Sequence, residues 1–114
     1  MTADSIASAY FALSNARDLE SIFAMFAADA TYSSDNTGLY FGIQDIREMM
    51  NAFFGAFPSL HWEVHSRTAL SDHIVEIEFT LKAKNSANEE LVRPGTERIV
   101  VSGGKIAHVE VRNR

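Results

Sequence analysis

The chain has 114 residues, a formal net charge of −5 and no cysteine. This length fits one domain, expected over residues 1–114, and it allows a core without disulfide bonds. The lack of cysteine excludes a thiolate metal site and a cysteine nucleophile, and it suits a cytoplasmic protein. Because the sequence has no basic block and no apolar run of about 20 residues, we expect neither nucleic-acid binding nor membrane insertion.

The first half of the sequence has the apolar periodicity of helices. Residues 4–16 place apolar side chains on one helical face. Asp18 is suited to cap a second helix, whose apolar stripe ends at Phe26. A short strand is predicted at about residues 30–33 and is followed by a polar turn. A third helix is predicted over residues 43–56, with an apolar stripe wide enough to cover a large hydrophobic surface.

The second half alternates apolar and polar residues with the period of two that strands show. Strands are predicted near residues 60–65, 75–82, 92–101 and 105–112, and a Ser-Gly-Gly turn joins the last two as a hairpin. Helices that precede a set of strands predict an α+β fold. In that fold an antiparallel sheet is covered by helices on one face.

The polar positions of these strands predict a charged outer sheet face, while Trp62 faces the core or a pocket wall. His61 and His65 are separated by about 13 Å in an extended strand, which is too far to share a metal ion. We therefore expect no metal site. A face of mixed charge fits either solvent or an interface. The residues expected on it are His61, Glu63, His65, Arg67, Glu76, Glu78 and Lys82.

Two regions of the sequence resemble a known family. FAADATY, YFG and IREMM within residues 26–54, followed by SGGKIAHVEV at residues 102–111, resemble the SnoaL-like, ketosteroid-isomerase-like branch of the nuclear transport factor 2-like superfamily. The resemblance covers nearly the whole chain. It implies a cone, in which a curved, mostly antiparallel sheet wraps around three N-terminal helices and leaves an apolar pocket at the open end. It also implies a homodimer that pairs through the outer sheet face.

In this family the segment after the second helix forms the rim of the pocket. Tyr32, Tyr40 and Phe41 would then line or close its mouth, and the alternative is that they only pack the helix junction. The third helix would form a pocket wall. The complete set of expected ligand-binding residues is Tyr32, Tyr40, Phe41, Phe53, Phe54 and Trp62.

Resemblance to ketosteroid isomerase suggests where acid–base groups would stand. Tyr10 stands eight residues before Asp18, which resembles the placement of the isomerase's oxyanion-hole tyrosine. Alternatively, Tyr10 belongs to the core stripe of its helix. The position at which the isomerase carries its catalytic base corresponds to Ser34 in this sequence. The neighbouring Asp35 is either a candidate base or an ordinary turn residue.

The position of the isomerase's second acid falls on Arg93, with no carboxylate beside it, so the isomerase constellation is incomplete. Arg93 could instead bind an anionic or enolate oxygen. Glu97, two pleats further along the strand, could pair with Arg93 as an acid–base site. The alternative is a salt bridge at a loop edge that contributes little.

Two classes of function fit this sequence. The first is an enzyme that acts on an apolar ring-containing or carbonyl substrate by isomerase- or cyclase-type proton transfer, with no cofactor. Its candidate catalytic residues are Tyr10, Asp35, Arg93 and Glu97. The second is a non-catalytic module that binds a small apolar molecule or dimerises, because one fold can host both functions.

Overall fold

A computed structural model describes residues 2–114 as three helices and six strands. The helices are α1 (Ala3–Asn15), α2 (Leu19–Ala24) and α3 (Ile43–Ala56). The strands are β1 (Phe26–Ser34), β2 (Gly38–Phe41), β3 (Ser59–Ala69), β4 (Ile74–Lys84), β5 (Glu90–Ser102) and β6 (Lys105–Asn113). The third helix has the bounds that its apolar period predicts, and Asp18 caps α2 by accepting a hydrogen bond from the Ser21 N–H.

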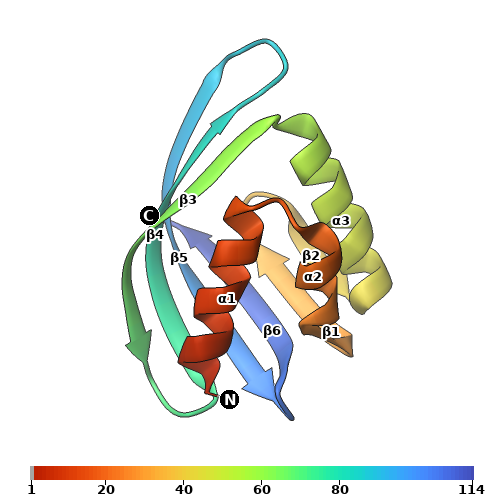
Figure 1. The fold of residues 1–114 in the computed structure, drawn as a ribbon, viewed down its shortest axis with the longest axis vertical. Coiled ribbons are helices and arrows are strands. Elements are labelled where there is room, and N and C mark those ends of the chain that lie inside the picture. Colours follow the sequence, from red (N-terminus) through yellow and green to blue (C-terminus); the bar gives the residue numbers. More distant parts are fainter. Residues whose placement is uncertain (1) are drawn as a thin grey trace.

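The six strands form one curved sheet in the order β2-β1-β6-β5-β4-β3 (Figure 1). Neighbouring strands are antiparallel except for β1 and β6, which run parallel. Figure 1 shows the helices on the concave side, with α1 lying across the long strands and α3 beside β1 and β2. The α+β cone predicted from the sequence is therefore confirmed.

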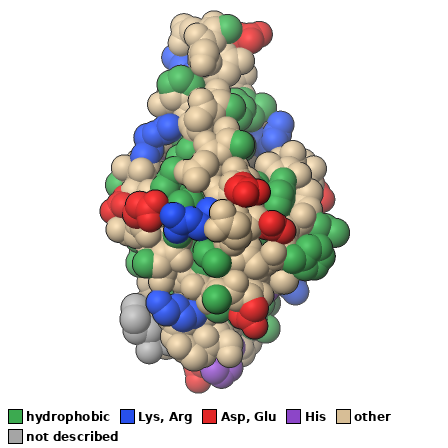
Figure 2. Space-filling model, turned by 90° about the vertical axis from the view of Figure 1, so that its right-hand side faces the viewer, with side chains coloured by type: hydrophobic (Ala, Val, Ile, Leu, Met, Phe, Trp, Pro, Cys, Tyr) green, Lys and Arg blue, Asp and Glu red, His purple; other side chains and the backbone are tan. Residues whose placement is uncertain are grey.

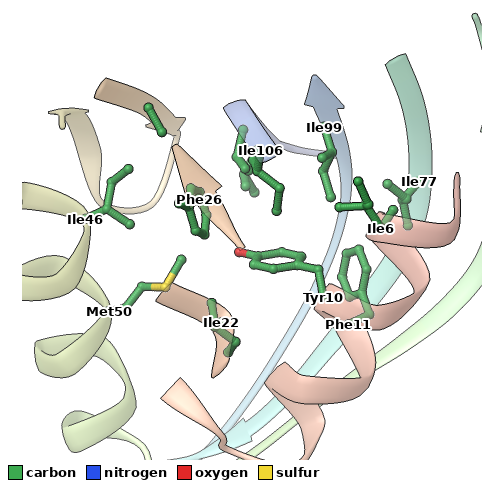
Figure 3. Packing of buried hydrophobic residues seen from close by; sticks show 14 of the residues in the cluster. Ile6, Tyr10, Phe11, Ile22, Phe26, Ile46, Met50, Ile77, Ile99 and Ile106 are labelled. Atoms are coloured by element: carbon green, nitrogen blue, oxygen red, sulfur yellow. The ribbon is translucent and has the colours of Figure 1, made fainter. Parts of the chain in front are cut away.

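The core lies between the concave face of the sheet and the three helices (Figure 3). Ile77 and Ile99 from the sheet, Ile22 from α2 and Ile46 from α3 are fully buried. Burial of each such side chain stabilises the fold by about 1.5–3 kcal/mol. The one-sided apolar alternation of β4 thus determines which face of the sheet the helices cover.

Phe26 is the point at which the structure departs from the predicted second helix. The helix ends at Ala24, and Phe26 begins β1, earlier than the predicted strand start near residue 30. Phe26 pairs with Ile106 of β6 and is buried in the core. An apolar residue at helical spacing can equally begin a buried strand when its partner strand lies far along the sequence.

A β-bulge in β3 reverses the predicted direction of one side chain. The pairing of β3 with β4 shifts register at His65, which is the additional residue of the bulge. Arg67 consequently pairs with the inward-facing Ile77, and its Nε lies 2.9 Å from Asp4 Oδ1 on α1. The prediction that Arg67 faces outward is therefore wrong.

The outer face of the sheet carries cross-strand ion pairs. Arg98 Nε lies 2.8 Å from Glu76 Oε2, and Lys82 Nζ lies 2.9 Å from Glu63 Oε2. Exposed pairs of this kind contribute at most about 1 kcal/mol each.

Figure 2, which views the side of the molecule that carries α3, shows charges of both signs among hydrophobic side chains. Homodimerisation through the outer sheet face stays a prediction.

In the part of the chain that the structure describes, each helix is too short or too polar to cross a membrane.

Asn15 and Arg17, at the end of α1, form hydrogen bonds with β3 and with the end of α3. The Asn15 Nδ2 donates to the Trp62 carbonyl at 3.0 Å, and its Oδ1 accepts from the Trp62 N–H at 2.8 Å. Because β3 is an edge strand, Asn15 supplies the partners that a further strand would provide. Arg17, with a positive φ of 59°, donates to the carbonyls of Phe54 and Phe57 at 2.8 and 2.9 Å.

Asn15→Ala is expected to lower the free energy of unfolding by about 1–3 kcal/mol, because it leaves two part-buried backbone groups of Trp62 unpaired. Urea denaturation followed by tryptophan fluorescence measures the change. Asn51→Ala is the matched control, since Asn51 is exposed on α3 and the substitution favours a helix. Equal stability of the two variants would contradict the prediction.

Candidate functional site

A cavity of about 60 Å³ lies inside the cone, between α1, α3 and the concave face of the sheet. Its walls are mainly apolar and include Phe11, Met49, Met50, Phe53, Phe54 and Trp62. Besides two tyrosines, the polar side chains that reach it are Ser14, Ser34, Asn36, Thr37, Arg93 and Glu97. An apolar enclosure with a few converging polar groups is typical of small-molecule sites.

The strand register explains how the polar groups of β5 reach this cavity. Trp62, Leu81 and Arg93 form one row across β3, β4 and β5 on the concave face. Alternate residues of a strand share a face, so Arg93, Gly95 and Glu97 all face the interior. Arg93 and Glu97 are separated by about 13 Å along the strand. β5 therefore contributes two polar positions to the cavity, Arg93 and Glu97, with Gly95 between them.

Glu97 is a buried carboxyl group without a full set of partners. Only 3% of its surface is exposed, and its Oε2 has no hydrogen-bond partner within residues 2–114. Burial raises the pKa of Glu97 to about 8, because the charged form loses its hydration in apolar surroundings. A carboxyl group with a pKa near neutrality can hold a proton or accept one, as acid–base catalysis requires.

Tyr10 of α1 and Tyr32 of β1 line the same cavity as Glu97. Figure 3 shows the Tyr10 hydroxyl pointing from α1 into the interior. Burial raises the pKa of both tyrosines, and the nearby Glu97 raises each pKa further, so both hydroxyls stay protonated and can donate hydrogen bonds. The Tyr10 ring also packs edge-on against Phe11 and Phe26. Tyr10 is thus both a core residue and a cavity residue.

Thr37 is a cavity residue that the sequence did not suggest. Thr37 lines the cavity, and its Oγ1 is buried and has no hydrogen-bond partner within the described residues. The Tyr40 hydroxyl donates to the Thr37 carbonyl at 2.6 Å and so holds the turn in place. Composition shows only a polar turn here, and no local signal marks Thr37 as a residue of the cavity. Thr37 and Glu97, each with a buried polar atom that lacks a partner, therefore line one cavity.

Asp35 lies in the turn and outside the cavity, so of its two interpretations the turn residue holds and the base in the pocket does not. Its Oδ2 accepts from the Asn113 N–H at 2.9 Å, and its Oδ1 lies 3.8 Å from a guanidinium nitrogen of Arg112. Ser34, the preceding residue, lines the cavity instead. Of the acidic residues among positions 2–114, Glu97 alone lines this cavity.

Arg93 and Glu97 form no ion pair in the described chain, so neither the acid–base pair nor the alternative salt bridge between them is present. The two side chains share a face but are two pleats apart. The position inferred for the isomerase's second acid carries Arg93, as expected. Glu97 supplies a buried carboxyl group four residues beyond the position inferred from the resemblance.

Of the three rim aromatics, Tyr32 lines the cavity. Phe41 is 69% exposed, and Tyr40 is half-buried against Tyr32 with a ring-centroid distance of 6.5 Å. Both belong to β2 at the sheet edge, so their side chains lie beside the cavity and outside its lining. The other expected wall residues, Phe53, Phe54 and Trp62, all line the cavity, and their rings contact one another.

Residues 7–109 of the chain match the protein family described as "SnoaL-like domain". A search of curated proteins gave no significant match.

Solved structures give the same fold. An NTF2-like protein of unknown function from Exiguobacterium has a TM-score of 0.85 at 15% identity, covering 96% of this chain and 98% of that one. A proposed polyketide cyclase from Pseudomonas putida has a TM-score of 0.82 at 19% identity, with coverages of 100% and 92%. A hypothetical protein with a ketosteroid isomerase-like fold from Catenulispora acidiphila has a TM-score of 0.84 at 18% identity, with coverages of 98% and 86%.

Proposed function

Because the chain belongs to the SnoaL-like family, we propose that its cavity binds a small, largely apolar carbonyl compound and moves a proton at the carbon beside the carbonyl, without a cofactor. The observation that carries this proposal is the Glu97 carboxyl group, buried with an unpartnered oxygen in an apolar cavity that two tyrosine hydroxyls also line. The solved relatives named for polyketide cyclisation and for a ketosteroid isomerase-like fold support the same class of chemistry.

The residues divide into two roles. The Tyr10 hydroxyl donates a hydrogen bond to the carbonyl oxygen, with Tyr32 beside it, and stabilises the negative charge that develops there. Ionised Glu97 takes the proton from the neighbouring carbon and returns it to the same or another carbon. With a pKa of about 8, Glu97 is a stronger base than an exposed carboxylate and is still ionised in part near neutrality.

The size of the cavity adds a condition. Its volume of about 60 Å³ is well below the ~300 Å³ at which typical ligand pockets begin. A ring-containing ligand therefore needs side chains of α3 to move. Met49 and Met50 line the cavity and have flexible, unbranched side chains that can change rotamer.

Deuterium exchange into 2-tetralone tests the proposal, because it reports proton transfer beside a carbonyl whatever the natural substrate is. NMR in D₂O should show exchange above the buffer rate, rising with pH up to about 8 as Glu97 ionises. Glu97→Gln should lower the protein-catalysed rate by about 100-fold or more, the contribution of a general base. Tyr10→Phe should lower it by about tenfold or more.

Glu63→Gln is the matched control, since Glu63 is on the outer face and paired with Lys82. It should exchange the ketone as fast as the wild type. A Glu97→Gln variant that keeps the full rate would refute proton transfer by Glu97.

The alternative function is a non-catalytic module that binds a small apolar ligand. It is favoured by Ser34, which stands at the cavity in the position where the resemblance places the isomerase's base. Quenching of Trp62 fluorescence by 2-tetralone without any protein-catalysed exchange would favour this alternative over the enzyme.

A further inference from the structure

Arg93 differs from the other cationic side chains of the protein. Among residues 2–114 it is the one Lys or Arg side chain that has neither a carboxylate nor a backbone carbonyl as a partner. Arg98, on the opposite face of the same strand, lies 2.8 Å from Glu76. The chain has 15 acidic residues and 10 basic ones. A cation left without a partner in such an acidic chain is therefore distinctive.

The position of Arg93 relates it to the cavity. Its side chain lines the cavity in the same row as Trp62 and is half-buried, whereas Glu97 is almost fully buried. Arg93 therefore marks the more open end and Glu97 the closed end. Between them Gly95 projects no side chain, and the Phe79 ring packs against it. An aromatic surface thus joins the two polar positions.

We propose that the ligand carries a carboxylate, which Arg93 binds, at the opposite end from the carbonyl or hydroxyl group that reaches Glu97. This inference rests on the proposed function, since it concerns the same cavity. A guanidinium group can donate two parallel hydrogen bonds to a carboxylate, which gives both attraction and a fixed orientation. The ligand class is therefore a rigid, ring-containing acid with an oxygen at its far end, whose length matches about two pleats of β5.

Two probes separate the role of Arg93 from that of the cavity as a whole. 2-Naphthol and 6-hydroxy-2-naphthoate share a fused-ring body and a hydroxyl group, and the second adds a carboxylate. Their binding to the full chain is measured by calorimetry at low and high NaCl. The wild type should bind the naphthoate about tenfold more tightly than 2-naphthol, which corresponds to one charge-assisted contact, and salt should weaken that preference.

Arg93→Met should remove the preference, so that the naphthoate and 2-naphthol bind with similar affinity, and Arg93→Lys should keep part of it. Arg98→Met is the matched control, because it removes a charge from the outer face of the same strand; its preference should equal that of the wild type. If Arg93→Met retains the preference, or if the wild type shows none, the carboxylate site is refuted and the cavity proposal stands. If neither probe binds the wild type, the proposed function and this inference both fail.

Discussion

Replacing Glu97 with glutamine is expected to remove a strong pH dependence from the stability of the fold. The pKa of Glu97 is about 8 in the folded protein and about 4.5 in its ordinary state. Below the lower value both the folded and the unfolded chain hold the proton, so Glu97 does not lower the free energy of unfolding there. Between the two values only the folded chain holds it, so the free energy of unfolding falls by about 1.4 kcal/mol per pH unit as pH rises.

Urea denaturation of the wild type and of Glu97→Gln between about pH 5 and pH 8 measures this difference. The variant keeps the shape of the side chain but carries no titrating group, so its relative stability should rise by roughly 3–4 kcal/mol over the range. Glu63→Gln, on the outer face, should follow the wild-type curve more closely. Parallel curves for wild type and Glu97→Gln would show that Glu97 does not titrate as a buried group.

Gly95→Val is expected to lower the free energy of unfolding by about 3 kcal/mol, because the site has no room for a side chain. A Cβ atom added at Gly95 would lie 2.8 Å from Cζ of Phe79 and 3.0 Å from the Arg112 carbonyl oxygen. The Phe79 ring would have to move into the cavity that it lines. Gly95→Ala should show a smaller loss of stability by the same denaturation measurement.

A double-mutant cycle identifies the cause of that loss. Phe79→Leu shortens the side chain that meets the new Cβ, so Gly95→Ala should cost less stability in the Phe79→Leu background than in the wild type. Additive effects of Gly95→Ala and Phe79→Leu would show instead that the Arg112 carbonyl oxygen alone limits the space at this position.

The elements were predictable from the sequence where local pattern and tertiary partner agree. The apolar period of α3 and the alternation of β4 predict both elements because each presents one face to the same core. Phe26 could not be assigned in this way, since the hydrogen bonds that make it a strand residue come from β6. The direction of Arg67 depends on one additional residue at His65, and periodicity carries no signal for such a bulge.

The site was predictable in part. Tyr10 was suggested by the resemblance and Glu97 by its residue type and its spacing from Arg93, and both line the cavity. The interpretation of Asp35 as a base failed because β1 ends at Ser34, which lines the cavity, and Asp35 begins the turn, where its carboxylate accepts a hydrogen bond from the Asn113 N–H. The burial that raises the pKa of Glu97 depends on how helices from another part of the chain cover β5, which no local pattern reports.

The parallel pair of β1 and β6 has a consequence for the synthesis of the protein. β6 lies between β1 and β5, so it connects the strands that follow α2 to the large antiparallel part of the sheet. Val109, which is fully buried, and Val111 complete the core from this strand. While residues 105–113 are still inside the ribosome, the edges of both β1 and β5 are therefore exposed. The cone can close only after β6 has emerged.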